Sequence, residues 1–261
     1  MKGVIQVVKA LILAGAPNTK KLTAVSPESY EALIPIAGRP MVDFVVAALE
    51  DSSSVEQIVI VGPEELGYLK RGKVSTLIPS GTTLIENFRR GLEKFEPNEL
   101  VLVATADIPL LTTAAVEDFL TQARTEAADF YYSIIEKKVG EAKYPDSTRT
   151  YVRLKDGTFT GGNLLLLYPH ILERGWDWAE EMYRLRKEPI KMCRLLGWGF
   201  FVQLLLGRLT IDSLENRFKQ ILGATGKAVI SPYPEIGIDV DKPDDYQLAL
   251  KYIGDSNPIA M

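Results

Sequence analysis

The chain has 261 residues, of which 46% are hydrophobic and 25% charged, which is typical of a globular domain with one substantial core. A net charge of −4 provides no extended basic surface, so the composition argues against a nucleic-acid-binding protein. A single cysteine, Cys193, and a single histidine, His170, exclude an intrachain disulfide and disfavour a zinc site or a Cys–His nucleophile pair, so we expect a cytoplasmic protein.

The sequence also lacks the marks of export and of membrane spanning. Nothing at its start has the charged stretch, apolar core and cleavage site of a signal peptide. The longest apolar run, 195–207, is too short to cross a bilayer and contains Gly197, Gly199 and Gln203. We therefore expect no stable membrane insertion.

The first predicted element is a buried strand over 7–13, interrupted only by Lys9 and ending at a glycine. A glycine directly after a first strand lets backbone N–H groups approach a phosphate closely. Many α/β proteins without a phosphate site begin in the same way, so both interpretations stay open at this point. The candidate nucleotide contacts here are Leu13, Ala14, Gly15 and Ala16.

Strand and helix patterns then alternate as far as residue 135. Helices are predicted at 41–49, at 84–95 and from 113, and strands at 57–61, 75–78, 100–104 and 129–135. This alternation predicts a three-layer α/β/α fold, with a mostly parallel sheet and helices on both faces. Ligands bind such sheets at the C-terminal ends of the strands, so Gly15 and Asp107, each directly after a predicted strand, are expected to share one pocket.

The second half is less regular and divides the chain in our prediction. A charged loop or lid is expected over 136–147, a hairpin turn at 155–157, a return strand at 228–230 and a last helix from Pro243. We expect a single domain over 1–261 made of three parts. These are a nucleotide-binding half (1–135), an acceptor-binding half (136–227) with a helical insertion (171–222), and a return strand with a C-terminal helix (228–261).

The segment 195–206 within the insertion is unusually apolar. We favour a helix buried beneath the insertion. The same composition is consistent with lining an apolar acceptor pocket, forming the face of a homodimer or touching a membrane surface.

Two segments carry candidate metal-binding carboxylates. Asp107 comes just after the strand at 100–104 and is held by Pro109, a position suited to binding Mg²⁺ against phosphates; a turn-capping role is the alternative. Asp239 and Asp241 are two residues apart, so on an extended segment they face the same side. The alternative, a favourable charge at the start of the last helix, explains Asp244 and Asp245 better than Asp241.

Two further segments combine glycines with polar side chains. Gly81 and Thr82 precede a predicted helix that contains Asn87, where amides and hydroxyls can bind a base edge or a phosphate; helix capping by threonine is compatible with this. The run Gly161-Gly162-Asn163 precedes an apolar strand and allows close approach of an acceptor substrate, with a β-bulge as the alternative.

Taken together, these motifs resemble the MobA-like nucleotidyltransferase (NTP transferase) family, which is related to molybdenum-cofactor guanylyltransferase and to sugar-nucleotide cytidylyl- and uridylyltransferases. The segments that resemble it are LAG with ALIPIAGRPM further on, D-x-P-L-L at Asp107, GTT at Gly81 and VDKPDD around Asp241. The resemblance implies a nucleotide-diphospho-sugar transferase-like (GT-A, Rossmann-like) fold. It implies transfer of NMP from an NTP to a phosphorylated or acidic small-molecule acceptor, with release of pyrophosphate. It further implies Mg²⁺ on Asp107 and Asp241, with Asp239 as the reserve ligand, and a base contact at Gly81 and Thr82.

The resemblance breaks down in two ways in the opening motif: the loop that carries Lys20 and Lys21 lacks the family's second glycine and its arginine, and residue 31 is an acid. Glu31 stands where the family has the lysine that neutralises the nucleotide phosphates. A carboxylate beside a triphosphate is repulsive unless it binds Mg²⁺ or a sugar hydroxyl. We expect Lys20 or Lys21 to replace the lysine, with Arg39 as a further phosphate contact; a shifted triphosphate and a loss of catalysis are the next alternatives.

Other classes of function remain in view. A metal-dependent glycosyltransferase would use Asp107 similarly with a nucleotide-sugar donor, and a catalytically inactive nucleotide-binding protein would explain Glu31. A dehydrogenase is disfavoured because Gly-Ala-Pro-Asn follows the first strand in place of the three-glycine fingerprint.

Overall fold

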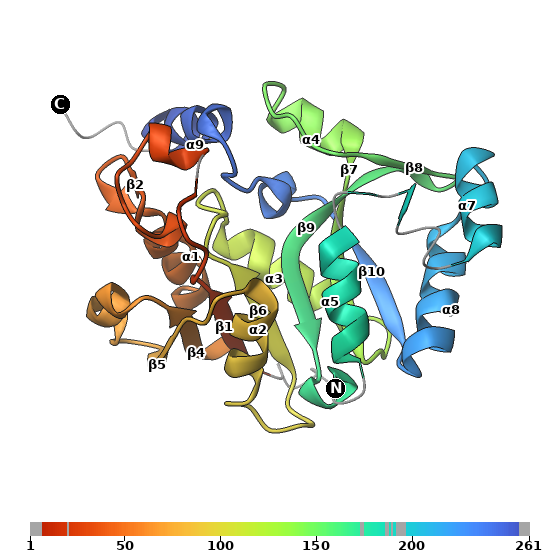
Figure 1. Cartoon of the computed structure of the whole chain (residues 1–261), viewed down its shortest axis with the longest axis horizontal. Coiled ribbons are helices and arrows are strands. Elements are labelled where there is room, and N and C mark those ends of the chain that lie inside the picture. The colour runs from red at the N-terminus through yellow and green to blue at the C-terminus, as the bar shows by residue number, and fades with distance from the viewer. Residues whose placement is uncertain are drawn as a thin grey trace.

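The computed structural model describes residues 7–19, 21–172, 175–185, 188, 190–191 and 197–255 (Figure 1). Its centre is an eight-stranded sheet in the order β10-β7-β9-β6-β1-β4-β5, with β8 paired to β9. The strands are β1 (Val8–Leu13), β4 (Val55–Gly62), β5 (Val74–Pro79), β6 (Val101–Thr105), β7 (Phe130–Glu136), β8 (Val152–Leu154), β9 (Gly157–Leu167) and β10 (Gly226–Ser231). A separate two-stranded hairpin joins β2 (Pro35–Ile36) to β3 (Arg39–Pro40).

The pairing directions confirm the predicted mostly parallel sheet. Strands β6, β1, β4 and β5 pair in parallel, as do β10 and β7. Between these two groups lies β9, which is antiparallel to both of its neighbours, β6 and β7.

The described helices cover both faces of this sheet. They are α1 (Met41–Glu50), α2 (Leu84–Leu92), α3 (Thr113–Ala123), α4 (Lys137–Lys143), α5 (Trp176–Leu185), α7 (Trp198–Leu205), α8 (Ile211–Leu222) and α9 (Pro243–Asp255). Five 3₁₀ turns complete the list: η1 (Leu22–Ala24), η2 (Glu31–Leu33), η3 (Glu64–Leu69), η4 (Pro169–Leu172) and η5 (Pro234–Gly237). None of the helices in the described part of the chain has both the length and the apolar character to span a membrane.

The alternation of apolar side chains along β1 produces the three layers. Ala10 and Ile12 point to one face and pack in the core formed with α1 and α3. Leu11 and Leu13 point to the other face, where Phe88 of α2 packs with them and makes an edge-to-face contact with a tryptophan of α5. Each large side chain buried in this way contributes roughly 1.5–3 kcal/mol. The strand is thus fixed in position by both helical layers.

The C-terminal segment returns to the opening loop and closes the edge of the sheet that bears the strand ends. Leu22, Ile34 and Met41 from the first part of the chain share a fully buried cluster with Val240 and Ala249. Helix α9 accordingly lies beside the β2 hairpin at the upper left of Figure 1. This packing brings the segment just before α9 to the C-terminal ends of β1 and β6.

Two sequence predictions differ from the structure. The charged stretch 136–147, predicted as a loop or lid, contains helix α4. The helix predicted to be buried within 195–206 is α7, which has no buried residue; Trp198 is 65% exposed and Leu205 64%. Only one side of α7 packs, against Leu154, Phe159 and Leu209, because the neighbouring surface is a small cluster rather than the main core. Residues 195 and 196 lie outside the described residues.

Candidate active site

Three carboxylates meet at the C-terminal edge of the sheet. Asp107 lies two residues beyond the end of β6. The backbone N–H of Val240 donates to the Asp107 carbonyl at 2.9 Å and so anchors the return segment there. Ligand oxygens of Asp107, Asp239 and Asp241 all lie within 4.8 Å of one another. The three acids singled out from the sequence are therefore brought together.

Burial and mutual repulsion disfavour the ionised forms of the carboxyl groups in this cluster. Burial, and then the charge of Asp239, raise the pKa of Asp107 to about 7, and Asp241 and Glu31 act in the same direction. A hydrogen bond from the Thr105 hydroxyl opposes the rise. Burial also raises the pKa of Asp239, although Arg149 lowers it. A set of closely spaced carboxylate oxygens of this kind fits a hard divalent cation such as Mg²⁺.

Arg149 belongs to the site and was not found from the sequence. It lies in the loop between α4 and β8, and its guanidinium forms an ion pair with the Asp239 carboxylate. Its Nη2 also donates to the Asp239 carbonyl at 2.8 Å and lies 3.6 Å from Asp245 Oδ1. The residue occupies an irregular segment without periodicity or motif, so no sequence pattern marked it.

Glu31 is held close to the carboxylate cluster by the opening loop. It is the first residue of η2, and its backbone N–H donates to the Ala16 carbonyl at 3.0 Å. Its negative charge contributes to the raised pKa of Asp107. The acid at this position thus adds to the negative potential of the site.

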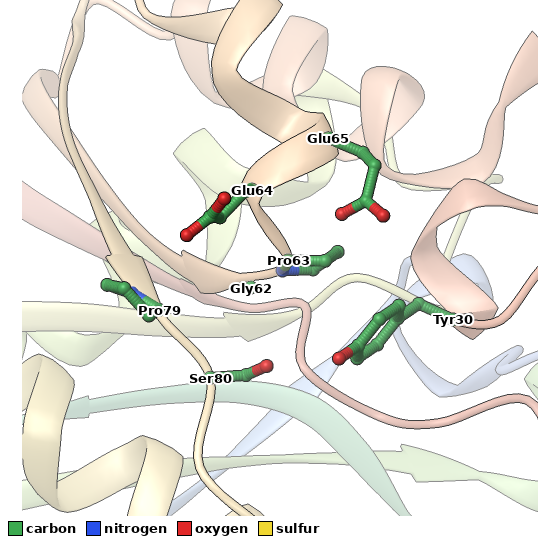
Figure 2. Close-up of a pocket in the computed structure, with 7 residues that line it drawn as sticks. All are labelled: Tyr30, Gly62, Pro63, Glu64, Glu65, Pro79 and Ser80. Carbon is green, nitrogen blue, oxygen red and sulfur yellow. The ribbon is translucent and has the colours of Figure 1, made fainter.

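A cleft of about 620 Å³ opens beside the ends of β4 and β5. Its lining residues are Tyr30, Gly62, Pro63, Glu64, Glu65, Pro79 and Ser80. In Figure 2 the Tyr30 ring and the Ser80 side chain point toward each other below Pro63, and the Glu64 and Glu65 carboxylates lie above it. The sequence indicated turns after both strands but gave no reason to select these side chains.

The loop after β1 separates the cleft from the carboxylates. The Ala14 N–H donates to the Val61 carbonyl at 2.7 Å, and the Ala106 N–H donates to the Leu13 carbonyl at 3.1 Å. The loop is therefore tied to β4, which borders the cleft, and to the strand end that bears Asp107. A Cβ on Gly15 would lie 2.5 Å from the Ser80 Cβ, so packing alone requires glycine there. The nucleotide contacts expected of Leu13, Ala14, Gly15 and Ala16 stay a prediction.

Side chains of α2 hold the segment that is predicted to contact the base. Asn87 is 3% exposed, and its Oδ1 accepts the Gly81 N–H at 2.6 Å. The Thr82 N–H and hydroxyl both donate to Glu86 Oε2, at 2.7 and 2.9 Å. Thr83 caps α2, as one of the two interpretations of this segment expected. Asn87 therefore positions the turn, and the nucleotide contacts expected of Gly81, Thr82 and Asn87 stay a prediction.

The structure describes two of the three expected phosphate-binding cations. Lys20 lies outside the described residues, and Lys21 is exposed just before η1. Arg39 turns toward α1: its Nη2 donates to the Asp43 carbonyl at 2.7 Å, and its guanidinium lies 4.7 Å from the centre of the Phe44 ring. The described contacts of Arg39 thus do not bring it to the carboxylate cluster.

The Gly161-Gly162-Asn163 run lies inside β9, where the pairing with β7 shifts register between Tyr132 and Ile134. This shift agrees with the β-bulge interpretation. A Cβ on Gly162 would collide with the Ser133 hydroxyl, and the Asn163 side-chain amide donates to the Ile236 carbonyl at 3.1 Å. The run has a packing role, and its contact with an acceptor stays a prediction.

A mostly parallel sheet with a cleft and a carboxylate cluster at its C-terminal strand ends is typical of nucleotide-binding α/β proteins. Residues 10–189 match the sequence profile of the MobA-like NTP transferase domain, and the chain belongs to that family. This confirms the resemblance drawn from the motifs.

Individual relatives agree with this assignment. A hypothetical transferase from Thermus thermophilus is 38% identical, with a TM-score of 0.77 over 92% of this chain and 99% of that one. The 2-C-methyl-D-erythritol 4-phosphate cytidylyltransferase of Clostridium novyi is 25% identical over 46% of this chain. The bifunctional protein GlmU of Sinorhizobium fredii is 31% identical over 46% of this chain. The matched region spans 54% of the cytidylyltransferase and 26% of GlmU.

A second Thermus thermophilus structure, that of a 2-C-methyl-D-erythritol 4-phosphate cytidylyltransferase, shares the fold. It has a TM-score of 0.55 and 14% identity, and covers 94% of this chain and 98% of that one. Its likeness therefore extends over nearly the whole chain, whereas the sequence match to the Clostridium novyi enzyme covers 46% of it.

Proposed function

We propose that the chain is a nucleotidyltransferase that moves NMP from an NTP to a phosphorylated or acidic small-molecule acceptor and releases pyrophosphate. The observation that supports this most is the meeting of Asp107, Asp239 and Asp241 at the strand ends, across one loop from a cleft of about 620 Å³. That volume lies within the range of small-molecule sites. In the proposal the nucleoside occupies the cleft and its triphosphate extends over the loop after β1 toward the carboxylates.

The proposed reaction requires little covalent participation by the protein. An acceptor oxygen attacks the α-phosphorus, a new P–O bond forms, and the bond to the β-phosphate breaks as pyrophosphate leaves. Asp107 and Asp241 would hold Mg²⁺, which when bound neutralises charge on the phosphates. The chain's own contribution is to orient the triphosphate with the loop amides, and to add cationic contacts from Lys20 or Lys21.

Pyrophosphate release tests the proposal directly. The full chain is incubated with Mg²⁺, each of the four NTPs and a panel of sugar phosphates and acidic sugars. We expect release with at least one pair, and a loss of about 10²–10³-fold in Asp107→Ala, because removing one charge-stabilising group costs that much. Asp244→Asn is the matched control, since Asp244 is exposed on α9. Release of a nucleoside diphosphate from a nucleotide-sugar would instead identify a glycosyltransferase.

Glu31 favours one alternative, a nucleotide-binding protein without catalysis. Its charge adds to the negative potential at Asp107, where the family has a lysine. That alternative predicts nucleotide binding with Mg²⁺ but no pyrophosphate with any acceptor. The Glu31→Lys variant would then gain turnover, whereas in an active enzyme it changes a rate that already exists.

A further inference from the structure

Two segments carry the carboxylates of the site, and a backbone hydrogen bond joins them at one end. The first segment, residues 107–112, follows β6 and leads to α3. The second, residues 235–241, begins within η5 and ends just before α9. The Val240 N–H donates to the Asp107 carbonyl at 2.9 Å. Because both partners are backbone groups, this connection does not depend on any side chain.

Side chains join the other ends of the two segments. The Thr112 hydroxyl donates to Glu235 Oε1 at 3.0 Å. Thr112 is also the N-cap of α3 and accepts the Ala115 N–H at 3.2 Å, so its hydroxyl is held by the first turn of that helix. Together with the backbone bond at Val240, the contact between Thr112 and Glu235 closes a ring of the two segments. The spacing of the carboxylates therefore depends on this one side-chain contact.

Glu235 is fixed from two further elements. Its side chain is 1% exposed, and its Oε2 accepts a hydrogen bond from Lys143 Nζ of α4 at 2.7 Å. The Asn163 side-chain amide of β9 donates to the carbonyl of the next residue, Ile236, at 3.1 Å. The Glu235 carboxylate is thus held in one place and uses one oxygen for α4 and the other for α3.

Stability alone does not explain a carboxylate at the position of Glu235. Burying a charge is unfavourable, and apolar side chains of similar volume often stabilise a protein as well as a buried ion pair does. The Lys143 side chain is 47% exposed, so its ammonium group can be hydrated without Glu235. An apolar side chain, however, could not accept the Thr112 hydroxyl, which requires an oxygen at a defined distance and direction. The role of Glu235 therefore lies in the geometry of the ring.

We propose that Glu235 is a positioning residue that, through Thr112, holds the two carboxylate-bearing segments at the spacing a divalent ion requires. The proposal rests on the proposed function only in assuming that the carboxylate cluster binds such an ion. Ligand oxygens must be placed to within a fraction of an ångström, and the groups that support them set this precision. Glu235 acts through the segments and is not itself a ligand, and Lys143 neutralises its buried charge.

Binding of Mn²⁺ to the full chain without nucleotide, followed by electron paramagnetic resonance, tests this role. Glu235→Gln keeps an oxygen that accepts the Thr112 hydroxyl, so its Mn²⁺ affinity should stay within about threefold of the native value. Glu235→Leu removes that oxygen and should weaken Mn²⁺ binding about tenfold or more. Its melting temperature in EDTA should nevertheless not fall below that of Glu235→Gln, because no charge is buried.

Thr112 provides an independent arm of the same test. Thr112→Ser keeps the hydroxyl and should bind Mn²⁺ within about threefold of the native affinity, whereas Thr112→Val should bind it about tenfold more weakly. Thr112→Val also removes the cap of α3, which lowers stability by itself. Thr210→Val is the matched control, because Thr210 caps α8 in the same way. This control should lose stability and keep the native Mn²⁺ affinity.

Equal Mn²⁺ affinities of Glu235→Leu and Glu235→Gln would overturn this role, as would a native chain that binds no Mn²⁺. Weaker binding that simply follows a lower melting temperature, in Thr210→Val as well, would show that Glu235 serves the fold alone. If Glu235→Leu does not fold, the comparison of Thr112→Val with Thr112→Ser decides. Mn²⁺ binding is measured without substrate, so a chain that binds Mn²⁺ but releases no pyrophosphate would count against the proposed function and not against this role.

Discussion

The carboxyl group of Asp107 binds its proton unusually tightly, and the cause lies in its neighbours. Partial burial shields it from water, and Asp239, Asp241 and Glu31 add repulsion. Its pKa of about 7 compares with 3.8 for the same group in an unfolded chain. Raised pKa values of this origin are common where a site is built to receive a positive charge. Without that charge, the ionised form of Asp107 destabilises the fold.

Asp107→Asn should stabilise the metal-depleted protein at high pH. Between pH 4 and 7 the unfolded chain binds fewer protons at this position than the folded chain, so the free energy of unfolding falls as pH rises. The penalty is absent below about pH 4 and complete above about pH 7, on the order of a few kcal/mol. Urea unfolding in EDTA should therefore show the variant more stable than the native chain at pH 8, and equal to it at pH 4.

Added Mg²⁺ should reverse the order at pH 8, because the ion stabilises only the chain that binds it. Asp244→Asn, whose carboxyl group is exposed, should follow the native chain throughout. A variant that is destabilised at pH 8 in EDTA would contradict the raised pKa and the crowding of charge from which it follows.

At the scale of elements, regular patterns were predictable and irregular ones were not. The strand β1 followed from an apolar run, whereas the meeting of Asp107 with Asp241 was expected from the family resemblance. Helix α4 was missed because Lys137–Lys143 has a charged composition without an apolar stripe. Arg149 was missed because its partners lie about 90 residues away in the sequence, where no local pattern links them.

The apolar helix α7 shows another limit of prediction from the sequence. Its composition indicated burial, but only one side of the helix packs against the rest of the structure. Leu205 and Leu209 provide a matched pair, being 64% and 1% exposed. Leu205→Ser should change the free energy of unfolding by less than about 0.5 kcal/mol, whereas Leu209→Ala should cost about 2–4 kcal/mol through lost burial and a cavity. Urea unfolding at low protein concentration measures both.

The Leu205→Ser variant also tests whether a second copy of the chain covers α7. If a homodimer buries this face, Leu205→Ser should lower the melting temperature only at concentrations where the native chain associates, as followed by light scattering. A large cost of Leu205→Ser in the monomer would contradict the exposure of this helix.

At the scale of the whole molecule, the site exists only when distant parts of the chain are packed together. The opening loop, the end of β6 and the segment before α9 meet through one buried cluster and through the bond from Val240 to Asp107. Tyr30 lines the cleft from the opening loop, and Ser80 lines it from the end of β5. A ligand that bridges the cleft and the carboxylates therefore binds the folded state alone, and its binding energy adds to the stability of the whole fold.

An NTP with Mg²⁺ should accordingly raise the melting temperature of the full chain. At a ligand concentration of about one hundred times the dissociation constant, the gain is about 2.7 kcal/mol, which corresponds to roughly 5–10 °C for a domain of this size. The shift should differ among ATP, GTP, CTP and UTP, because the base occupies the cleft, and it should shrink in EDTA and in Asp241→Asn. An equal shift with all four nucleotides would mean that the site binds the phosphates and not the base. The absence of any shift, with Mg²⁺ present, would contradict the proposed nucleotide site altogether.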